Sequence, residues 1–385
     1  MSTTDPLPLR SVTHRTLPDG ATPSLLGFGL MRLPKVRPDA DDIDYETAAA
    51  MFRRALDAGI TYFDTAYMYH GGRSETCVGD LLSAFPRDAY TLADKMPVGM
   101  LKDEADIDRV FQDQLAKTRA GHFDFYLLHA MSRDGWARAR ALRVVEYLER
   151  KKAEGLIRRL GFSFHDSPEA LREILDARRW DFVQIQLNYY DWDSAYRSRE
   201  QYEMLAAEGI PVIVMEPVRG GALANLDAEG NRILRAAAPD ASIASWALRF
   251  AASLPGVAVV LSGMSTPAQL EDNLATFSPL TPLSDDEHET LRRALDAFRR
   301  NVKVNCTGCR YCVPCPSGVP IPDIFALANR RHRDHDDAAF RRGYEALPVN
   351  ASACVKCWKC TSKCPQHLHI PGELAKIASD IASLG

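Results

Sequence analysis

The sequence lacks several features that define other classes of protein. No apolar run is long enough to cross a bilayer, and the polar, proline-containing segment Met1–Asp19 has no apolar core of a secretion signal. The 47 basic and 51 acidic residues give a formal net charge of −4, so no basic footprint for nucleic acid or an anionic membrane is present. We therefore expect a cytoplasmic protein that binds neither nucleic acid nor membrane and acts on a small molecule or another protein.

Cysteine is almost missing from the first 305 residues, where Cys77 stands alone, but eight of the nine cysteines follow in two clusters. In a reducing compartment, clustered cysteines favour metal binding over disulfides. Cys77 itself is expected to be a small core residue on a helix. The change in composition near Asn301–Asn305 predicts two domains, residues 1–300 and 301–385.

Most of the chain alternates short apolar runs with longer segments of helical periodicity, which is typical of repeated β-α units around a parallel sheet. An open dinucleotide-binding sheet would show G-x-G-x-x-G after its first strand, and that motif is missing. The series therefore predicts a closed (β/α)8 TIM barrel. The expected strands are Ser24–Leu30, Thr61–Asp64, Tyr90–Lys95, Phe125–His129, Arg159–Ser163, Phe182–Gln186, Val212–Glu216 and Val257–Ser262.

Candidate helices lie between these strands and end near glycines that suit a left-handed cap. The clearest are Asp44–Ala58 before Gly59, Glu104–Ala120 before Gly121 and Ala137–Glu154 before Gly155. A further helical stretch, Asp285–Arg300, precedes the cysteine-rich part.

Four ionisable side chains converge on consecutive strand ends. Asp64, Lys95 and His129 end the second, third and fourth expected strands, and Tyr69 follows in the loop after Asp64. Taken singly, these could be a turn residue, a solvated lysine and a structural histidine. Because barrel enzymes build their sites at the C-terminal ends of strands, the joint placement favours an active site.

The same residues carry a family resemblance. Asp64-Thr65-Ala66-Tyr67-Met68-Tyr69, then Gly72-Arg73-Ser74-Glu75 and Val78-Gly79, resemble an aldo-keto reductase segment, and Lys95 and Leu127-Leu128-His129 match later positions. The resemblance covers residues 15 to 280 or so. It implies a catalytic tetrad in which Tyr69 is the general acid/base, Lys95 and Asp64 tune it, and His129 orients the carbonyl of a small-molecule substrate.

Elementary electrostatics suits these roles. A free tyrosine has a pKa of about 10, so a neighbouring cation such as Lys95 is expected to lower the pKa of Tyr69. Asp64 would keep the Lys95 ammonium protonated, since a lone buried lysine tends to lose its proton. His129 would stabilise the developing alkoxide as a neutral hydrogen-bond donor.

The resemblance also implies contacts to NADP(H) or NAD(H). Ser163 and Gln184 match the residues that hold the nicotinamide carboxamide, and Gly220 and Gly221 lie in a loop that allows backbone approach to the pyrophosphate, although a simple loop turn is the alternative. Phe164, Met215 and Gln269 depart from the family pattern, and Gln269 replaces an arginine that binds the 2′-phosphate, so the choice of nucleotide stays open. The adenosine-phosphate loop is expected to contain Ser262, Gly263, Met264, Gln269 and Asn273.

The C-terminal cysteines form two runs that each resemble the bacterial ferredoxin pattern and end in Cys-Pro. The resemblance implies a mostly helical ferredoxin-like domain with two [4Fe–4S] clusters, each held by three cysteines of one run and the fourth of the other. A zinc site is the alternative, because paired C-x-x-C elements also suit a tetrahedral site of four thiolates. The expected ligand sets are Cys306, Cys309, Cys312 and Cys364 for one cluster, and Cys354, Cys357, Cys360 and Cys315 for the other.

The two halves predict a nicotinamide-dependent carbonyl reductase with an iron–sulfur domain. A hydride carries two electrons and each cluster passes one, so the clusters could be structural, regulatory or a docking surface. Two alternatives remain: a redox sensor or electron-transfer module that reports nucleotide state to a partner, and a reductase fed by ferredoxin or another redox protein.

Overall fold

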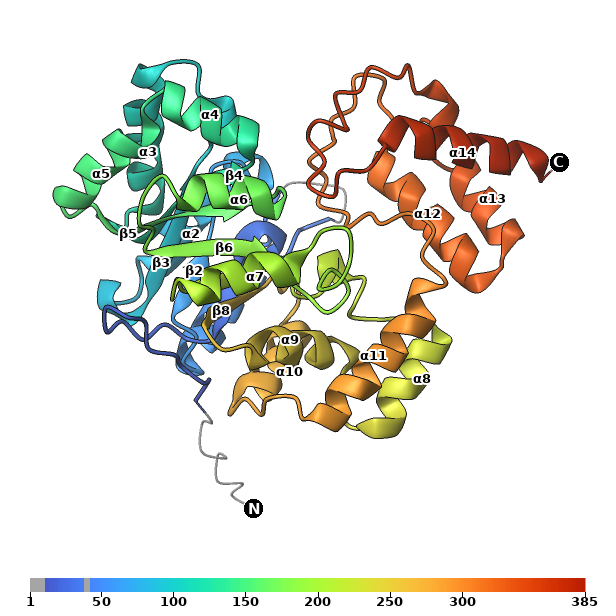
Figure 1. Cartoon of the computed structure of the whole chain (residues 1–385), viewed down its shortest axis with the longest axis horizontal. Coiled ribbons are helices and arrows are strands. Elements are labelled where there is room, and N and C mark those ends of the chain that lie inside the picture. Colours follow the sequence, from blue (N-terminus) through green and yellow to red (C-terminus); the bar gives the residue numbers. More distant parts are fainter. Residues whose placement is uncertain (1–10, 38–41, 385) are drawn as a thin grey trace. The chain divides into compact units, whose positions relative to one another are not determined.

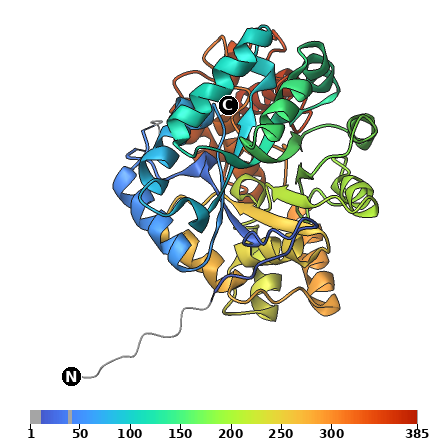
Figure 2. The ribbon, with the colours of Figure 1, turned by 90° about the vertical axis from the view of Figure 1, so that its left-hand side faces the viewer.

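The computed structural model describes residues 11–37 and 42–384 of the chain. Its eight strands close into one barrel in sequence order, and every neighbouring pair is parallel. This confirms the predicted (β/α)8 fold, and Figure 2 shows helices along the outside of the strands. The strands are β1 Leu26–Gly29, β2 Tyr62–Asp64, β3 Thr91–Met96, β4 Phe123–Met131, β5 Ile157–Phe164, β6 Phe182–Gln186, β7 Val212–Met215 and β8 Val257–Ser262.

Three barrel helices are followed by the glycines that the sequence analysis expected at their ends. Gly59, Gly121 and Gly155 all have positive φ angles of 72° to 90°, the left-handed conformation that glycine adopts without a steric penalty. No helix in the described ranges is both long and apolar enough to cross a membrane. The helices between the strands are α1 Tyr45–Asp57, α2 Ser74–Leu82, α3 Glu104–Thr118, α4 Arg133–Ala141, α5 Val144–Ala153, α6 Pro168–Leu175, α7 Ser198–Ala207, α8 Ala228–Ala237 and α9 Ile243–Ser253, and α10 Pro267–Phe277 follows the last strand.

One predicted helix is wrong. The stretch Ala137–Glu154 is divided between α4 and α5, because Arg143 adopts a left-handed conformation with φ of 55° and interrupts the helix. The two parts pack against different neighbours, α4 on α6 and α5 on β5. Tertiary packing therefore overrides a helical periodicity that runs through the break.

The barrel interior is filled by large side chains near the starts of the strands. Tyr62, Phe125 and Phe182 are buried there and contact one another in edge-on ring pairs, with centroids 4.9 and 5.0 Å apart. The opposite, C-terminal ends of the strands carry buried polar residues instead, including Asp64 and Lys95. The apolar filling thus leaves the C-terminal mouth of the barrel for chemistry.

The chain divides into two compact units. The first comprises residues 1–217 and 245–283 and holds all eight strands; the second comprises residues 218–244 and 284–385. The domain boundary expected at residue 300 stays a prediction. In addition to α8, the second unit contains α11 Asp285–Arg299, α12 Ile321–Asp334, α13 Asp337–Glu345 and α14 Ile370–Ser383 (Figure 1). Helix α8 packs against α11.

The cysteine-bearing part has its own core. Ile321, Ile324 and Phe325 on α12 are buried together with Ile370 and Leu374 on α14. The stretch between the two cysteine runs is rich in Arg and Asp, and it contains all of α12 and α13. Its charges lie on the outer faces of two helices that supply this small core.

Gly79 on α2 allows a close approach to the end of α3. A Cβ atom at this position would lie 2.0 Å from the carbonyl oxygen of Lys117, far inside van der Waals contact. Since a backbone carbonyl cannot move aside as a flexible side chain can, the two helices would have to separate.

We therefore predict that Gly79→Ala destabilises the protein by about 1–3 kcal/mol, the usual cost of overpacking. Thermal unfolding of the full chain should show an apparent Tm lower by roughly 2–10 °C. Gly99→Ala is the matched control, because no atom lies within 4 Å of its Cβ position. Equal Tm values for the two variants would contradict the packing argument.

Candidate active site and cysteine quartets

The four residues predicted as a tetrad lie at the C-terminal mouth of the barrel. Asp64 is the last residue of β2, Lys95 lies one residue from the end of β3, and His129 lies near the end of β4. Tyr69 begins a short 3-10 helix, Tyr69–Gly72, directly after β2. All four side chains are buried, so the fold brings the predicted residues to one end of the barrel.

Lys95 is the centre of this arrangement. Its side chain is 0% exposed, and its Nζ donates hydrogen bonds to Asp64 Oδ1 at 2.6 Å and to the carbonyl oxygen of Thr65 at 2.6 Å. A third, longer hydrogen bond of 3.5 Å reaches Tyr69 Oη. The three donors of the ammonium are therefore all used, which satisfies the requirement for burying such a charge.

Asp64 balances that charge. Burial raises the pKa of Asp64 above its usual value, and the adjacent Lys95 ammonium opposes the rise. Removing one partner of a buried ion pair leaves the other uncompensated, at a cost of about 3–5 kcal/mol. The pair thus fixes the lysine beside Tyr69.

The pKa of Tyr69 differs in direction from the sequence-based expectation. Burial raises it well above the usual value of 10, and nearby carboxylates, of which Asp64 acts most strongly, add to the rise. Lys95 was expected to lower this pKa, but its ammonium is 3.5 Å from the hydroxyl and is engaged more closely by Asp64. Tyr69 is therefore a protonated phenol at neutral pH, suited to donate a proton.

His129 lies beside Tyr69. The two rings form an edge-on pair with centroids 6.0 Å apart and an interplanar angle of 84°. Burial lowers the pKa of His129 well below its usual value of 6.5, and the positive charge of Lys95 lowers it further. The imidazole is therefore neutral at physiological pH and can donate one hydrogen bond without carrying a charge.

Behind Lys95 lies a buried network that sequence reasoning missed. Asp94 Oδ1 accepts the backbone N–H of Lys95 at 2.8 Å, and Gln114 Nε2 donates to Asp94 Oδ1 and to Glu75 Oε1, both at 2.9 Å. Tyr126 donates its hydroxyl hydrogen to Gln114 Oε1. Glu75 belongs to the motif that carried the family resemblance, so this residue could have pointed to the network from the sequence. The network ties β3 beside Lys95 to Gln114 on α3 and Tyr126 on β4.

Arg32 was also missed, because an arginine after a first strand has no distinctive sequence signal. It ends the short 3-10 helix Leu30–Arg32 after β1. A Cβ atom on Gly263 would lie 3.2 Å from Arg32 Cδ, so the arginine side chain runs along the loop after β8. Its Nη2 is buried and has no hydrogen-bond partner among the described residues. Its positive charge also acts against the rise in the pKa of Tyr69.

Seven of the residues expected to contact the nucleotide lie in the barrel unit with the tetrad. Ser163 and Gln184 are direct neighbours across β5 and β6. Ser163 Oγ accepts the backbone N–H of Ala130 at 2.7 Å, whereas Gln184 Oε1 is buried without a hydrogen-bond partner among the described residues. The others end β8, follow it or lie in α10: Ser262, Gly263, Met264, Gln269 and Asn273.

Two contacts organise the segment after β8. Asn273 Nδ2 donates to Ser262 Oγ at 2.7 Å, which ties α10 to the end of the strand. Gln269 Oε1 accepts the backbone N–H of Ser265 at 2.7 Å. Because its oxygen is engaged locally and it carries no charge, Gln269 does not replace the cation that a 2′-phosphate prefers.

Gly220 and Gly221 belong instead to the second unit. Gly220 has a φ of 65°, and a Cβ atom there would lie 1.7 Å from the carbonyl oxygen of Thr307. The neighbouring Arg219 is buried and donates from Nη2 to the carbonyl oxygen of Asn305 at 3.3 Å. Gly220 is therefore required for close packing against the first cysteine run. Its expected approach to a pyrophosphate stays a prediction.

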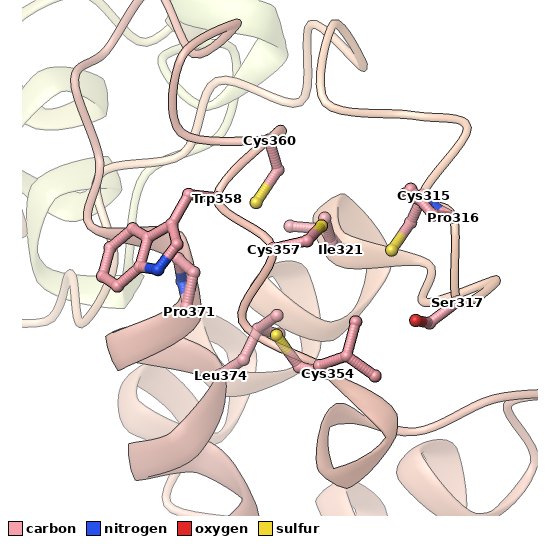
Figure 3. Close-up of a pocket in the computed structure, with 11 residues that line it drawn as sticks. Cys315, Pro316, Ser317, Ile321, Cys354, Cys357, Trp358, Cys360, Pro371 and Leu374 are labelled. Atoms are coloured by element: carbon pink, nitrogen blue, oxygen red, sulfur yellow. The ribbon is translucent and has the colours of Figure 1, made fainter.

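The eight clustered cysteines line two small pockets, each with three cysteines of one run and the fourth of the other. Cys315, Cys354, Cys357 and Cys360 line one, and Figure 3 shows them around a common space. The second pocket is lined by Cys306, Cys309, Cys312 and Cys364. These are the two groupings that the ferredoxin resemblance implies.

The sulfur environment favours a bound metal centre over free thiols. Burial and the neighbouring thiols of Cys309, Cys306 and Cys364 raise the pKa of Cys312 to about 12, so a bare thiolate there is unfavourable without a compensating cation. Gly308 N–H donates to Cys306 Sγ at 3.4 Å, the type of contact that tunes iron–sulfur centres.

Comparison with known proteins finds relatives among oxidoreductases. The chain is 25% identical over 256 residues to an uncharacterized oxidoreductase of Bacillus subtilis, covering 59% of this chain and 81% of that protein. It is 27% identical over 299 residues to L-galactose dehydrogenase of Arabidopsis thaliana, covering 71% and 89%.

Among solved structures, an aldo-keto reductase from Bacillus halodurans in its holo form is 26% identical, with a TM-score of 0.61, over 74% of this chain and 96% of that one. An aldo-keto reductase from Klebsiella pneumoniae in complex with NADPH shares the fold at 22% identity, with a TM-score of 0.57, over 73% and 95%.

Two family models divide the chain between them. The model of the aldo/keto reductase family matches residues 25–296, and that of a 4Fe-4S dicluster domain matches residues 305–376. The first match spans most of the chain and includes the whole barrel. The protein therefore belongs to the aldo/keto reductase family and is an oxidoreductase of that type with a ferredoxin-type 4Fe-4S domain.

Proposed function

We propose that the barrel reduces a small-molecule carbonyl compound with NADPH or NADH, and that Tyr69 donates the proton. The observation that carries this proposal is the buried Lys95 ammonium, which is held by Asp64 and Thr65 and reaches the Tyr69 hydroxyl. A residue set with no chemical role would not keep a charged lysine fully buried beside a phenol and a neutral imidazole.

The barrel mouth fits a nicotinamide nucleotide. The buried Gln184 Oε1, which has no hydrogen-bond partner among the described residues, and its neighbour Ser163 offer the polar atoms that a carboxamide group needs. When bound, the reduced nicotinamide supplies the hydride. One relative is called an NADH-specific methylglyoxal reductase of Escherichia coli, and the Klebsiella structure contains NADPH, so the proposal includes both nucleotides.

Residues of the chain would stabilise the substrate oxygen and protonate it. His129, being neutral, would donate a hydrogen bond to the substrate oxygen and stabilise the negative charge that develops there. Tyr69, being protonated, would transfer its proton to that oxygen. Lys95 would then stand next to the phenolate that forms, where its positive charge is favourable.

We also propose that the two cysteine quartets hold [4Fe–4S] clusters. The fourth ligand crosses from one run to the other in each quartet, and the matching domain family is a dicluster one. When bound, each cluster exchanges one electron at a time. Ferredoxin or another redox protein is therefore a suitable partner in addition to the carbonyl substrate.

Tyr69→Phe tests the proton donor. With clusters intact, the wild-type protein should oxidise NADPH or NADH in the presence of a reactive aldehyde or quinone, and the variant should lose about 10²–10⁴-fold in kcat. Tyr67→Phe is the matched control, because its ring faces Lys117 at 4.4 Å and its hydroxyl interacts with Arg109. Undiminished turnover in Tyr69→Phe would refute the assignment.

The pH dependence of carbonyl reduction gives a second test. The raised pKa of Tyr69 keeps the proton donor protonated as pH rises, and the lowered pKa of His129 keeps the imidazole neutral as pH falls toward 6.5. We expect kcat/KM to stay within about threefold between about pH 7 and 9, with no ionisation near the usual histidine value. An ionisation step in the kcat/KM profile with an apparent pKa of about 6.5 or 8 would contradict the lowered pKa of His129 or the raised pKa of Tyr69.

Metal content tests the quartets. Anaerobically purified protein should contain about eight iron and eight sulfide per chain and little zinc. Cys309→Ser and Cys357→Ser, one from each quartet, should each lower the content by about four iron. Cys77→Ala is the control, because this cysteine is buried on α2 and lines neither pocket. Stoichiometric zinc, or full iron in either serine variant, would overturn the ligand sets.

A further inference from the structure

The loop of the second cysteine run exposes two large apolar side chains. Val355 is 69% exposed and Trp358 is 47% exposed, although Cys354 and Cys360 on either side are largely shielded. Among the described residues, few other large apolar side chains are this exposed. An aromatic and an aliphatic side chain presented together to solvent are typical of the centre of a protein interface.

The same loop is basic. From Ala346 to Gly372 the sequence contains three lysines and no aspartate or glutamate, although the whole chain has a net charge of −4. The lysines are all exposed, and the described residues provide none of them with an ion pair. We call Val355, Lys356, Trp358, Lys359 and Lys363 the Trp358 surface.

Several other cations of the second unit do have an acidic partner. Arg310 is paired with Asp323, Arg331 with Asp337, and Lys376 with Glu373. A local excess of positive charge without intramolecular partners attracts a negatively charged surface.

The loop backbone brings the surface residues close to the quartet, since Val355 and Trp358 also line its pocket. Lys356 and Trp358 have φ angles of 53° and 63°, the left-handed region that side chains rarely adopt, and they flank Cys357. Figure 3 shows the Trp358 ring pointing away from the cysteine sulfurs. His369 packs edge-on against the indole with centroids 4.9 Å apart, so the exposed ring is held in place. A non-glycine residue keeps this conformation only where the surrounding structure holds it there.

The quartet beneath this surface is close to solvent. Cys357 is itself exposed, and in the sequence it lies between Lys356 and Trp358, which are exposed as well. A redox centre held there would be within short reach of any protein bound to the Trp358 surface.

We propose that the Trp358 surface docks a small, acidic one-electron carrier protein, and that electrons pass between the carrier and the quartet of Cys315, Cys354, Cys357 and Cys360. The inference rests on the proposed occupancy of that quartet. In each transfer the reduced carrier loses one electron and the centre on this chain gains it, with no bond formed or broken.

The size and charge of the patch favour such a carrier over other acidic partners. Redox complexes use small interfaces, below about 1,200 Å², with an apolar centre and a charged rim. Three lysines are few for nucleic acid, where affinity grows with the number of phosphates neutralised.

The test uses the full-length, anaerobically purified protein with a plant-type [2Fe–2S] ferredoxin and a flavodoxin as probes. Calorimetry at low and high NaCl gives the Kd, and stopped-flow absorbance gives the rate at which dithionite-reduced ferredoxin is reoxidised by the protein. The variants are the triple Lys356→Glu/Lys359→Glu/Lys363→Glu and the single Trp358→Ala. Lys102→Glu/Arg293→Glu/Lys376→Glu is the control, since it changes the net charge equally at exposed positions elsewhere.

We expect at least one probe to bind the wild-type protein, more weakly at high salt. The lysine triple should raise Kd and slow electron transfer at least tenfold, Trp358→Ala should raise Kd several-fold, and the control triple should change neither by more than twofold. Iron content and the visible spectrum should be those of the wild type in all variants, which separates lost docking from lost clusters.

Three results would overturn the proposal: binding of neither probe, equal losses in both triples, or unchanged docking in the lysine triple. Wild-type protein without iron would instead refute the proposed clusters. Loss of binding to phosphatidylglycerol vesicles in the lysine triple, with ferredoxin binding intact, would reassign the surface to a membrane.

Discussion

The buried ion pair between Lys95 and Asp64 is the interaction on which the active end of the barrel depends. An ammonium with no exposure to water needs a counter-charge and a hydrogen-bond acceptor for each of its donors. Asp64, Thr65 and Tyr69 provide them, and all three are presented by β2 or the loop that follows it. The closed parallel sheet makes this possible, because it places the ends of β2, β3 and β4 side by side.

The sequence predicted the barrel well because its signals were local. Each strand is a short buried run, and glycines such as Gly59 and Gly155 adopt the left-handed conformation expected after a helix. The prediction failed at Arg143, where a non-glycine residue takes that conformation because α4 and α5 pack on different neighbours. No local pattern reports such a requirement.

The candidate site could likewise be predicted from the sequence only in part. The convergence of Asp64, Lys95, His129 and Tyr69 follows from strand-end positions and family motif, and so could be predicted. The direction of the Tyr69 pKa could not, because it results from burial and from carboxylates on separate strands. Likewise, the fit of Gly220 against Thr307 joins residues far apart in sequence, and only the folded chain reveals it. Both features depend on residues that are distant in the sequence, the first through burial and charge and the second through packing.

We propose hydride chemistry in the barrel and one-electron exchange in the cysteine domain, and the source of the hydrogen added to the substrate carbon tests this division most directly. The protein would be incubated anaerobically with a reactive aldehyde and a reduced nicotinamide nucleotide that carries deuterium in place of the C4 hydrogen that is transferred. The alcohol product would be analysed by mass spectrometry. We expect one deuterium on the carbinol carbon of every product molecule. Product that forms with hydrogen from water at that carbon would contradict it.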